Sequence, residues 1–408
     1  MNKTTTLPVT FDDIKAAQKR IADGILLSPC HQSIALSQLC ESTIYCKLEY
    51  LQRTGSFKER GARNALLLLQ ERGNTKGVIA ASAGNHALAL TYHGTLLQIP
   101  VTVVMPGFAP LIKRMSCEKM GANVILHGET FAQAKRKADE IAAEQGLTYV
   151  HGYDDPAIIA GQGVTGLEIL EQIDDLNAIV VPIGGAGLIA GLALAVKTLR
   201  PEIEIIGVEP ENAPCYTKAL EAGKPTFVES RPTLADGLAI AEVGHNAFEI
   251  GRRHIDRTVL VNEKEIALAI VRLMELEKSV VEGSGAAGLA AILGGKLPEL
   301  KGKNVALVLC GGNIDLGILA RLIDIGLVAD GRLSKFTAVI SDRPGGLAHL
   351  AKVIAENGAS VKQISHDRAF SDANITKVKV LCTVETRDAN HVQKLHENLI
   401  QNGIHILN

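Results

Sequence analysis

A lysine at the start of a predicted helix is the first residue of this chain that could do covalent chemistry. Lys58 lies between a predicted strand over residues 44–50 and a predicted helix over residues 62–69. Ser56 and Glu59 have the spacing of a capping box, which places the helix start at Ser56. The positive end of the helix dipole lowers the pKa of an amine in the first turn. Such an amine is suited to forming an imine, although an ordinary capped helix with an exposed lysine is the simpler alternative.

A run of glycines indicates a second kind of chemistry, the binding of an anion. The stretch between an apolar strand and an apolar helix is Gly184-Gly185-Ala186-Gly187-Leu188. Glycines there let backbone N–H groups approach a phosphate, and the helix dipole adds to the attraction. Residues 185–190 also fit the dinucleotide fingerprint G-x-G-x-x-A, and Glu209 ends the next strand at the spacing of a ribose ligand. A nicotinamide-dependent oxidoreductase is therefore an alternative.

Two further turns carry small or polar residues at the ends of predicted strands. The backbone of the first could hold a carboxylate, and its members are Ser82, Ala83, Gly84, Asn85 and His86. Asn85 could bond a ring hydroxyl or could simply cap a helix, and for His86 we favour a structural role. The second turn begins with Cys310, and a buried thiol is more often packing than chemistry. These loops all follow strands, where open α/β sheets bind ligands.

The composition restricts the classes of protein to which the chain could belong. Its 408 residues are 47% hydrophobic and 21% charged, which is typical of a globular enzyme with two or three domains. The net charge of −2 gives no basic surface for nucleic acid. Seven cysteines without a CxxC pair favour a reducing compartment, and the polar start of the chain does not resemble a signal peptide, so we expect a cytoplasmic protein. We interpret the uncharged residues 178–196 as a strand, a loop and a buried helix rather than a membrane span.

Strands and helices alternate through most of the chain and must position these loops. An amphipathic helix is predicted over residues 11–22, and a second helix over residues 131–144. Short apolar strands are predicted at residues 78–81, 101–105, 123–126, 179–183, 203–208 and 305–309. This alternation predicts an α/β fold with parallel strands covered by helices on both faces.

A change of pattern near residues 326–335 separates a second unit. The predicted elements there are a strand, a helix, two strands, a helix and a last strand, at residues 336–341, 347–357, 359–365, 376–384, 389–402 and 404–407. This βαββαβ order is the ferredoxin-like split unit. We therefore expect an antiparallel sheet that is separate from the first body.

Four ordered motifs resemble those of the pyridoxal-phosphate enzymes with the tryptophan-synthase-β fold. They are Ser56-Phe57-Lys58-Glu59-Arg60-Gly61, Ser82-Ala83-Gly84-Asn85-His86, Gly184-Gly185-Ala186-Gly187-Leu188 and Gly311-Gly312-Asn313-Ile314-Asp315. The resemblance covers about residues 10–325. Within that family the chain is similar to the threonine dehydratases with a single ACT regulatory domain, because the last unit contains Asp342-Arg343-Pro344-Gly345-Gly346-Leu347. This implies a catalytic domain over residues 1–328, with a smaller subdomain at about 48–150, and an ACT domain over 329–408.

The resemblance also implies roles for individual residues. Lys58, beside Phe57, would hold the cofactor pyridoxal 5′-phosphate as a Schiff base and act as the α-proton base. Asn85 would bond the pyridoxal hydroxyl, residues 184–188 would hold the phosphate, and residues 82–86 would receive the substrate carboxylate. Cys310 stands where the family commonly has a serine at the pyridine nitrogen, and both side chains are neutral.

Some relatives bind a cation, and the chain matches their site only in part. Glu209 and Ala213 correspond to two of the ligands, whereas Cys215 stands where an aspartate would complete the site. A monovalent or divalent cation is therefore an open possibility at this position.

The reaction implied by the resemblance is an α,β-elimination from L-threonine that gives 2-oxobutanoate and ammonia, with L-serine to pyruvate as a side reaction. Ala83 stands where serine racemases have the serine that returns a proton, so we expect elimination rather than racemisation. An amino-acid effector, isoleucine or valine, is expected at the ACT domain of a homo-oligomer, either a dimer or a tetramer. A serine dehydratase or racemase of this family, and a purely regulatory amino-acid-binding protein, are alternatives. Isoleucine biosynthesis and threonine breakdown are both open as the physiological route.

Overall fold

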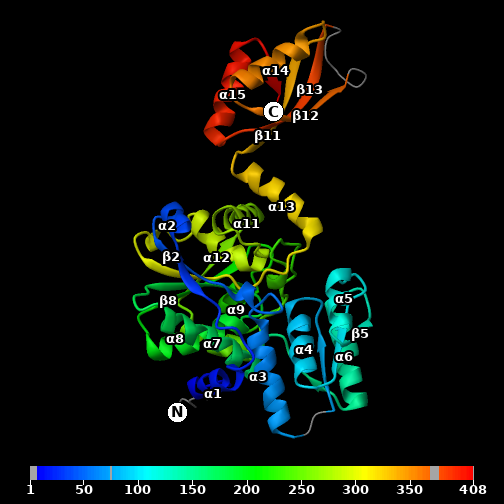
Figure 1. Cartoon of the computed structure of the whole chain (residues 1–408), viewed down its shortest axis with the longest axis vertical. Helices are drawn as coiled ribbons and strands as arrows, with labels where there is room; N and C mark the ends of the chain where they lie inside the picture. Colours follow the sequence, from blue (N-terminus) through cyan, green and yellow to red (C-terminus); the bar gives the residue numbers. More distant parts are fainter. Residues whose placement is uncertain (1–6, 74–75, 368–375, 408) are drawn as a thin grey trace. The chain divides into compact units, whose positions relative to one another are not determined.

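The computed structural model describes residues 7–73, 76–367 and 376–407, which divide into two compact units (Figure 1). The units are Met1–Asp315 and Leu316–Asn408. The division falls ahead of helix α13 (Leu316–Ala329), whereas the sequence analysis began the last domain at residue 329. Each unit has a hydrophobic core of its own.

A six-stranded sheet forms the larger part of the first unit. Its order is β1-β2-β10-β7-β8-β9, and its strands are Cys30–Ser33, Thr43–Lys47, Asn304–Val308, Ala178–Pro182, Glu204–Pro210 and Arg257–Val261. All neighbours are parallel except β1 and β2. The antiparallel strand β1 and the helix α2 (Ile34–Cys40) were not predicted.

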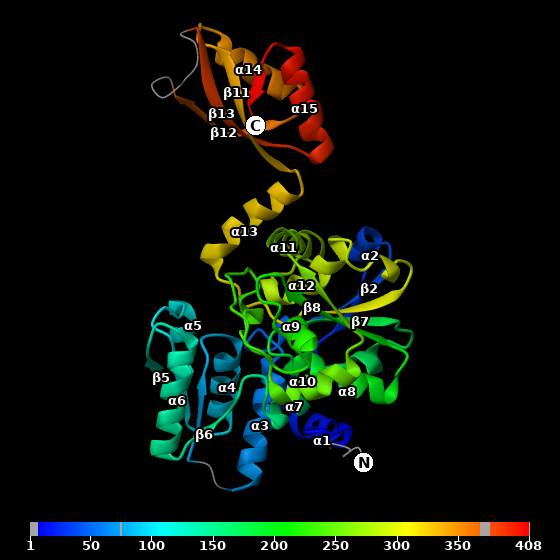
Figure 2. The ribbon, with the colours of Figure 1, turned by 180° about the vertical axis from the view of Figure 1, so that it is seen from behind.

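Helices cover both faces of this sheet, and alternate residues of β7 show why. Ile179 and Val181 join the core formed with α1 (Phe11–Ile21), α7 (Pro156–Gln172), α8 (Gly187–Leu199) and α10 (His245–His254). Val180 lies against Gly288 of α12 (Gly283–Leu293), which packs on α11 (Glu263–Glu277). Figures 1 and 2 show these two helical groups on opposite sides of the sheet. Successive side chains of a strand point to opposite faces, so a fully apolar strand can be buried on both.

A four-stranded parallel sheet forms the smaller part of the first unit. Its order is β5-β4-β3-β6, with strands Asn123–Leu126, Val101–Met105, Val78–Ala81 and Thr148–Tyr149. One face packs on α3 (Lys58–Glu71), α4 (Asn85–Leu96) and α5 (Leu111–Lys119), and the other on α6 (Phe131–Gln145). The predicted strands at residues 78–81, 101–105 and 123–126 are confirmed, as is the α/β class.

Two sequence-based interpretations have different outcomes. Residues 178–196 form β7, the glycine loop and most of α8, as expected. Within the described part of the chain, every helix is too short or too polar to span a membrane. The strand predicted over residues 44–50 instead ends at Lys47 and is followed by a short 3-10 helix, Glu49–Leu51.

The remaining elements of this unit are α9 (Cys215–Ala222) and two further 3-10 turns, Asp236–Leu238 and Pro298–Leu300.

The second unit has the predicted βαββαβ order. After α13 come β11 (Leu333–Ser341), α14 (Gly346–Glu356), β12 (Ser360–Asp367), β13 (Lys377–Glu385), α15 (Ala389–Gln401) and β14 (His405–Leu407). The strands form an antiparallel sheet of order β12-β13-β11-β14. Alternate residues of β13 are buried in a core with α14 and α15. The unit therefore has the half-buried, two-layer pattern of an antiparallel sheet.

Candidate active site

Lys58 is the first residue of α3, and the helix start is not the one predicted. The residue before the helix is Phe57, which makes no side-chain cap hydrogen bond. Glu59 does not reach back to Ser56, because its carboxylate accepts from the Thr54 backbone N–H and contacts the His93 ring. The predicted capping box is therefore wrong: a side chain elsewhere in the fold competes for the glutamate.

The Lys58 amine lies in surroundings that favour its neutral form. Its Nζ donates to the Gly152 carbonyl oxygen at 2.6 Å. Burial lowers the pKa of Lys58 to about 8, against the opposing effects of Cys310 and Glu282. The lowered pKa agrees with the sequence-based expectation, but its main cause is desolvation rather than the helix dipole.

A segment that the sequence analysis missed joins Lys58 to the glycine loop. Residues 151–154 connect β6 to α7, and the Tyr153 ring lies so close to Gly185 that a Cβ there would be 2.2 Å from it. A Cβ at Gly187 would be 2.3 Å from the Tyr153 carbonyl oxygen. Only glycine permits this close approach. His151 accepts from the backbone N–H of Tyr153, and burial lowers the pKa of His151 to about 4.

The glycine loop follows β7 and leads into α8. Ala186 has the left-handed conformation, with φ 69°, and immediately precedes the helix. The backbone N–H groups of a helix start have no partner within the helix, so this loop has the arrangement expected of an anion site. Leu188 is buried in the core beneath it.

Asn85 does not cap α4 but is its first residue. Its Nδ2 donates to Glu282 at 2.8 Å, and its Oδ1 accepts from the Asn313 side chain at 2.9 Å. Glu282 precedes α12, some two hundred residues away in the chain, and the sequence analysis did not identify it. The only local signal is its place between Val281 and the glycine-rich start of that helix. The structure thus brings Asn85 and the Cys310–Asn313 turn together around a buried carboxylate.

The other residues of the turn after β3 differ in how deeply their side chains are buried. Ser82 accepts from the Gly84 backbone N–H at 3.3 Å, and Ala83 is half-buried. His86 is buried and bonds the Val150 carbonyl through Nε2 at 3.0 Å. Burial lowers the pKa of His86 to about 3, so it is neutral. These contacts agree with the structural role that we favoured for His86.

Cys310 lies at the end of β10 beside Lys58 and Glu282. Its carbonyl oxygen accepts from the Phe57 backbone N–H at 3.0 Å, and Gly311 forms a β-bridge with Ser56. Burial raises the pKa of the Cys310 thiol well above its ordinary value, and the Glu282 charge adds to this effect. The thiol is therefore neutral.

Comparison with known proteins identifies the family to which the chain belongs. Residues 21–311 match the model of the family described as "Pyridoxal-phosphate dependent enzyme". The chain belongs to the pyridoxal-phosphate-dependent enzymes. It is 43% identical over 398 residues to an L-threonine ammonia-lyase of Thermotoga maritima, an alignment that covers 98% of this chain and 99% of that protein.

Solved structures of this family have the same fold as the first unit. A processed threonine deaminase from Solanum lycopersicum is similar with a TM-score of 0.73 and 36% identity, over 77% of this chain and 91% of that one. A serine racemase from Dictyostelium discoideum is similar with a TM-score of 0.72 and 36% identity, over 76% of this chain and all of that one. The relatives therefore include both reaction types that the sequence analysis weighed.

The residues around Lys58 fit pyridoxal phosphate. The chain supplies an amine of lowered pKa, a glycine loop in which Gly185 and Gly187 leave no room for a Cβ, and a neutral thiol. The hydroxyls of Ser56 and Ser284 are buried and have no hydrogen-bond partner among the described residues. Buried hydroxyls of this kind normally find a partner, so a bound group that offers acceptors is consistent with them.

Glu209 is used differently from a cation or ribose ligand. Its two carboxylate oxygens accept from the backbone N–H groups of Tyr216 and Thr217, at 2.7 and 2.8 Å, and from the Thr217 hydroxyl. It therefore caps α9, where a carboxylate is favourable. The Cys215 thiol donates to the Gly184 carbonyl oxygen at 3.3 Å. The described residues contain no group of three or more acidic, histidine or cysteine side chains that could hold a metal ion. The cation site expected at Glu209 and Ala213 stays a prediction.

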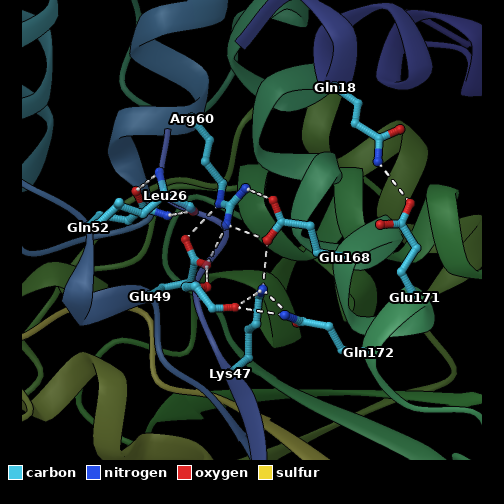
Figure 3. Close-up of polar contacts among 10 residues, drawn as sticks. Gln18, Leu26, Lys47, Glu49, Gln52, Arg60, Glu168, Glu171 and Gln172 are labelled. Carbon is cyan, nitrogen blue, oxygen red and sulfur yellow. Dashed lines mark hydrogen bonds and ion pairs between the residues drawn. The ribbon is translucent and has the colours of Figure 1, made fainter. Parts of the chain in front are cut away.

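A buried charge network surrounds Arg60, which follows Lys58 by two residues in α3 (Figure 3). The Arg60 guanidinium is fully buried and bonds both Glu49 and Glu168, at distances of 2.6–2.7 Å. Lys47 bonds Glu168 at 2.6 Å and Gln172 at 2.9 Å. The network joins the first turn of α3 to α7 and to the end of β2. Arg60, part of the lysine motif in sequence, is thus a structural residue that holds the lysine-bearing helix.

Proposed function

We propose that this chain is an L-threonine ammonia-lyase that converts L-threonine to 2-oxobutanoate and ammonia, and L-serine to pyruvate more slowly. The observation that carries the proposal is the Lys58 amine, whose pKa burial lowers to about 8, among three loops that follow parallel strands. The near full-length similarity to an L-threonine ammonia-lyase supports the choice of substrate.

The chemistry divides between the cofactor and the chain. When bound, pyridoxal phosphate supplies the electron sink for the charge that develops at the substrate α-carbon. We assign to Lys58 the covalent attachment of the cofactor and the removal of the α-proton. An amine with a pKa of about 8 has a substantial unprotonated fraction near neutral pH, which a base requires.

The remaining residues bind and orient. We assign the phosphate to the backbone of residues 184–188 and the substrate carboxylate to residues 82–86, where helix-start N–H groups favour anions. Phe57 and Asn85 would lie beside the cofactor ring, with Asn85 donating to the ring hydroxyl. Cys310 would face the pyridine nitrogen, and its neutral thiol would leave that nitrogen largely unprotonated.

The second unit would make the activity responsive to an amino acid. We propose that it is an ACT domain that binds isoleucine or valine, in a cytoplasmic homo-oligomer that serves isoleucine biosynthesis. The turn Pro344-Gly345-Gly346 at the start of α14 is the candidate carboxylate site. Gly345 has φ 97° there, a conformation that favours glycine.

The experiment that tests the proposed function is the removal of the Lys58 amine. The wild-type protein, incubated with pyridoxal phosphate and reduced with borohydride, should carry a pyridoxyl adduct on Lys58 by peptide mass spectrometry. Lys58→Ala should lose the adduct and form no 2-oxobutanoate, because the α-proton has no base. Lys135→Ala, which alters a surface lysine paired with Asp139, should behave as wild type. An adduct on another lysine, or turnover by Lys58→Ala, would refute the assignment.

A further inference from the structure

Glu282 is a buried carboxylate to which neither the family assignment nor the proposed mechanism gives a role. It is 4% exposed and immediately precedes α12. One carboxylate oxygen accepts from Asn85 Nδ2 at 2.8 Å, and the other from the Asn313 backbone N–H at 3.1 Å. A Cβ at Gly311 would be 2.5 Å from the first oxygen, so the chain closes tightly around it. Buried charges are retained only where partners compensate them.

These contacts determine how the Asn85 amide is oriented. An ionised carboxylate only accepts hydrogen bonds, so the Asn85 nitrogen, not its oxygen, must face Glu282. The Asn85 oxygen then accepts from Asn313 Nδ2, whose own orientation is set because it also donates to the Thr54 carbonyl oxygen at 2.7 Å. Each amide nitrogen thus donates to a group that can only accept hydrogen bonds. This group is the ionised Glu282 carboxylate for Asn85 and the Thr54 carbonyl oxygen for Asn313. Among the hydrogen bonds of the described residues, one N–H of Asn85 has no partner.

Four charged or titratable groups face Glu282 from the elements around it. Asp236 precedes Leu238 in a 3-10 turn, Lys113 lies on α5, Lys58 starts α3, and Cys310 follows β10. The pKa of Glu282 is raised to about 7, chiefly by burial and in addition by the charge of Asp236. Lys113 and the bonds from Asn85 and Asn313 act in the opposite direction. The carboxylate therefore changes its charge near neutral pH.

We propose that Glu282 is a positioning residue that holds the Asn85 carboxamide with its second N–H available to the ring hydroxyl of the cofactor. The inference rests on the proposed placement of the ring beside Asn85. Glu282 acts through Asn85 and touches neither substrate nor reacting atoms. Protonation of Glu282 removes its charge and turns an obligatory acceptor into a group that can also donate, so the Asn85 amide is held less firmly and its orientation depends on Asn313 alone. Cofactor affinity should therefore fall as the pH is lowered through about 7.

A double-mutant cycle on cofactor binding tests this role. The dissociation constant of pyridoxal phosphate is measured by absorbance titration of the apo-enzyme, at pH 8 and pH 6, for wild type, Glu282→Gln, Asn85→Ala and the double variant. Glu282→Gln should raise the constant about tenfold at pH 8, the size expected for one hydrogen bond to a charged group. It should also reduce the difference between pH 8 and pH 6 to the part that the titration of Lys58 itself contributes. In the Asn85→Ala background it should have no further effect, because a residue that acts through another is not additive with it.

Controls separate this inference from the proposed function. Glu277→Gln changes a partly buried carboxylate that accepts from Ser33, and it should bind the cofactor as wild type does. If Glu282→Gln does not fold, Asn313→Ala takes its place in the cycle, because it removes the other anchor of Asn85. An equal effect of Glu282→Gln with and without Asn85, or an affinity unchanged by the substitution, would overturn the positioning role. A wild-type protein that forms no covalent adduct would instead contradict the proposed function.

Discussion

At the scale of single residues, the site shows how one missing hydroxyl could decide the reaction. Racemisation requires a second acid on the face of the substrate opposite Lys58. The resemblance to serine racemases implies that they have a serine at the position of Ala83, whose methyl group has no proton to give. Ser82 is adjacent, and its hydroxyl accepts from the Gly84 backbone N–H at 3.3 Å. Neighbouring side chains of an extended segment point to opposite faces, so Ser82 should not replace the missing donor, and elimination is the expected outcome.

This reasoning predicts the effect of Ala83→Ser. The native enzyme should form pyruvate from L-serine with negligible D-serine, and Ala83→Ser should gain measurable D-serine formation because it supplies a proton donor. Chiral chromatography of a long incubation measures both products. Ser82→Ala is the matched control and should gain no racemase activity. D-serine formed by the native enzyme as fast as pyruvate would mean that another residue returns the proton.

At the scale of elements, the lysine-bearing helix is held by charge rather than by apolar packing alone. Arg60 and Lys47 balance Glu49 and Glu168, so the buried network is neutral as a whole. Removing one partner of a buried pair leaves a charge without compensation, which costs more than the intact pair contributes. Replacing both partners of one ion pair should therefore cost less free energy of unfolding than replacing one partner alone.

Arg60→Met should accordingly lower the free energy of unfolding by about 3–5 kcal/mol, because Glu49 remains buried without its partner. The double variant Arg60→Met/Glu49→Gln should recover part of that loss, since Lys47 and Glu168 still balance each other. Urea unfolding of the apo-enzyme, followed by circular dichroism, measures both. Arg114→Met breaks only the surface pair with Glu118 and should cost less than about 1 kcal/mol. Equal losses for the two single variants would contradict the assignment.

At the scale of the whole molecule, the chain consists of two units, each with a hydrophobic core of its own. Among the described residues, three core clusters of the first unit draw on residues up to Cys310, and the core cluster of the second begins at Phe336. A unit with a complete core can fold without the rest of the chain. The regulation that we propose for the second unit is therefore separable in principle from catalysis by the first.

A shortened chain tests this separation. A chain ending at Ala329 should deaminate L-threonine with a kcat within about twofold of the full-length enzyme, because the first unit retains its whole core. It should lose any response to isoleucine or valine, as measured by initial rates across an effector titration. A chain ending at Asp315, without α13, is the comparison that decides to which unit this helix contributes. If the full-length enzyme ignores every proteinogenic amino acid, the second unit has a structural role instead.

The sequence by itself determined the features that depend on neighbouring residues. Short apolar runs predicted β3, β4 and β5 to the residue, because burial on both faces of a parallel strand requires such runs. Glycine loops between strands and helices predicted the candidate anion site, and the βαββαβ pattern predicted the second unit. Lys58 was singled out by its place before a helix.

Tertiary structure decided which partner each buried polar side chain found. Glu59 was predicted to cap a helix, but His93 and Thr54 engage it instead. Asn85 was weighed as a cap and was found bonded to Glu282, a residue far away in sequence. A buried donor or acceptor must be satisfied by whatever group packing brings near it. Such a group often lies on another element, so the spacing of residues along the chain does not predict the hydrogen bond.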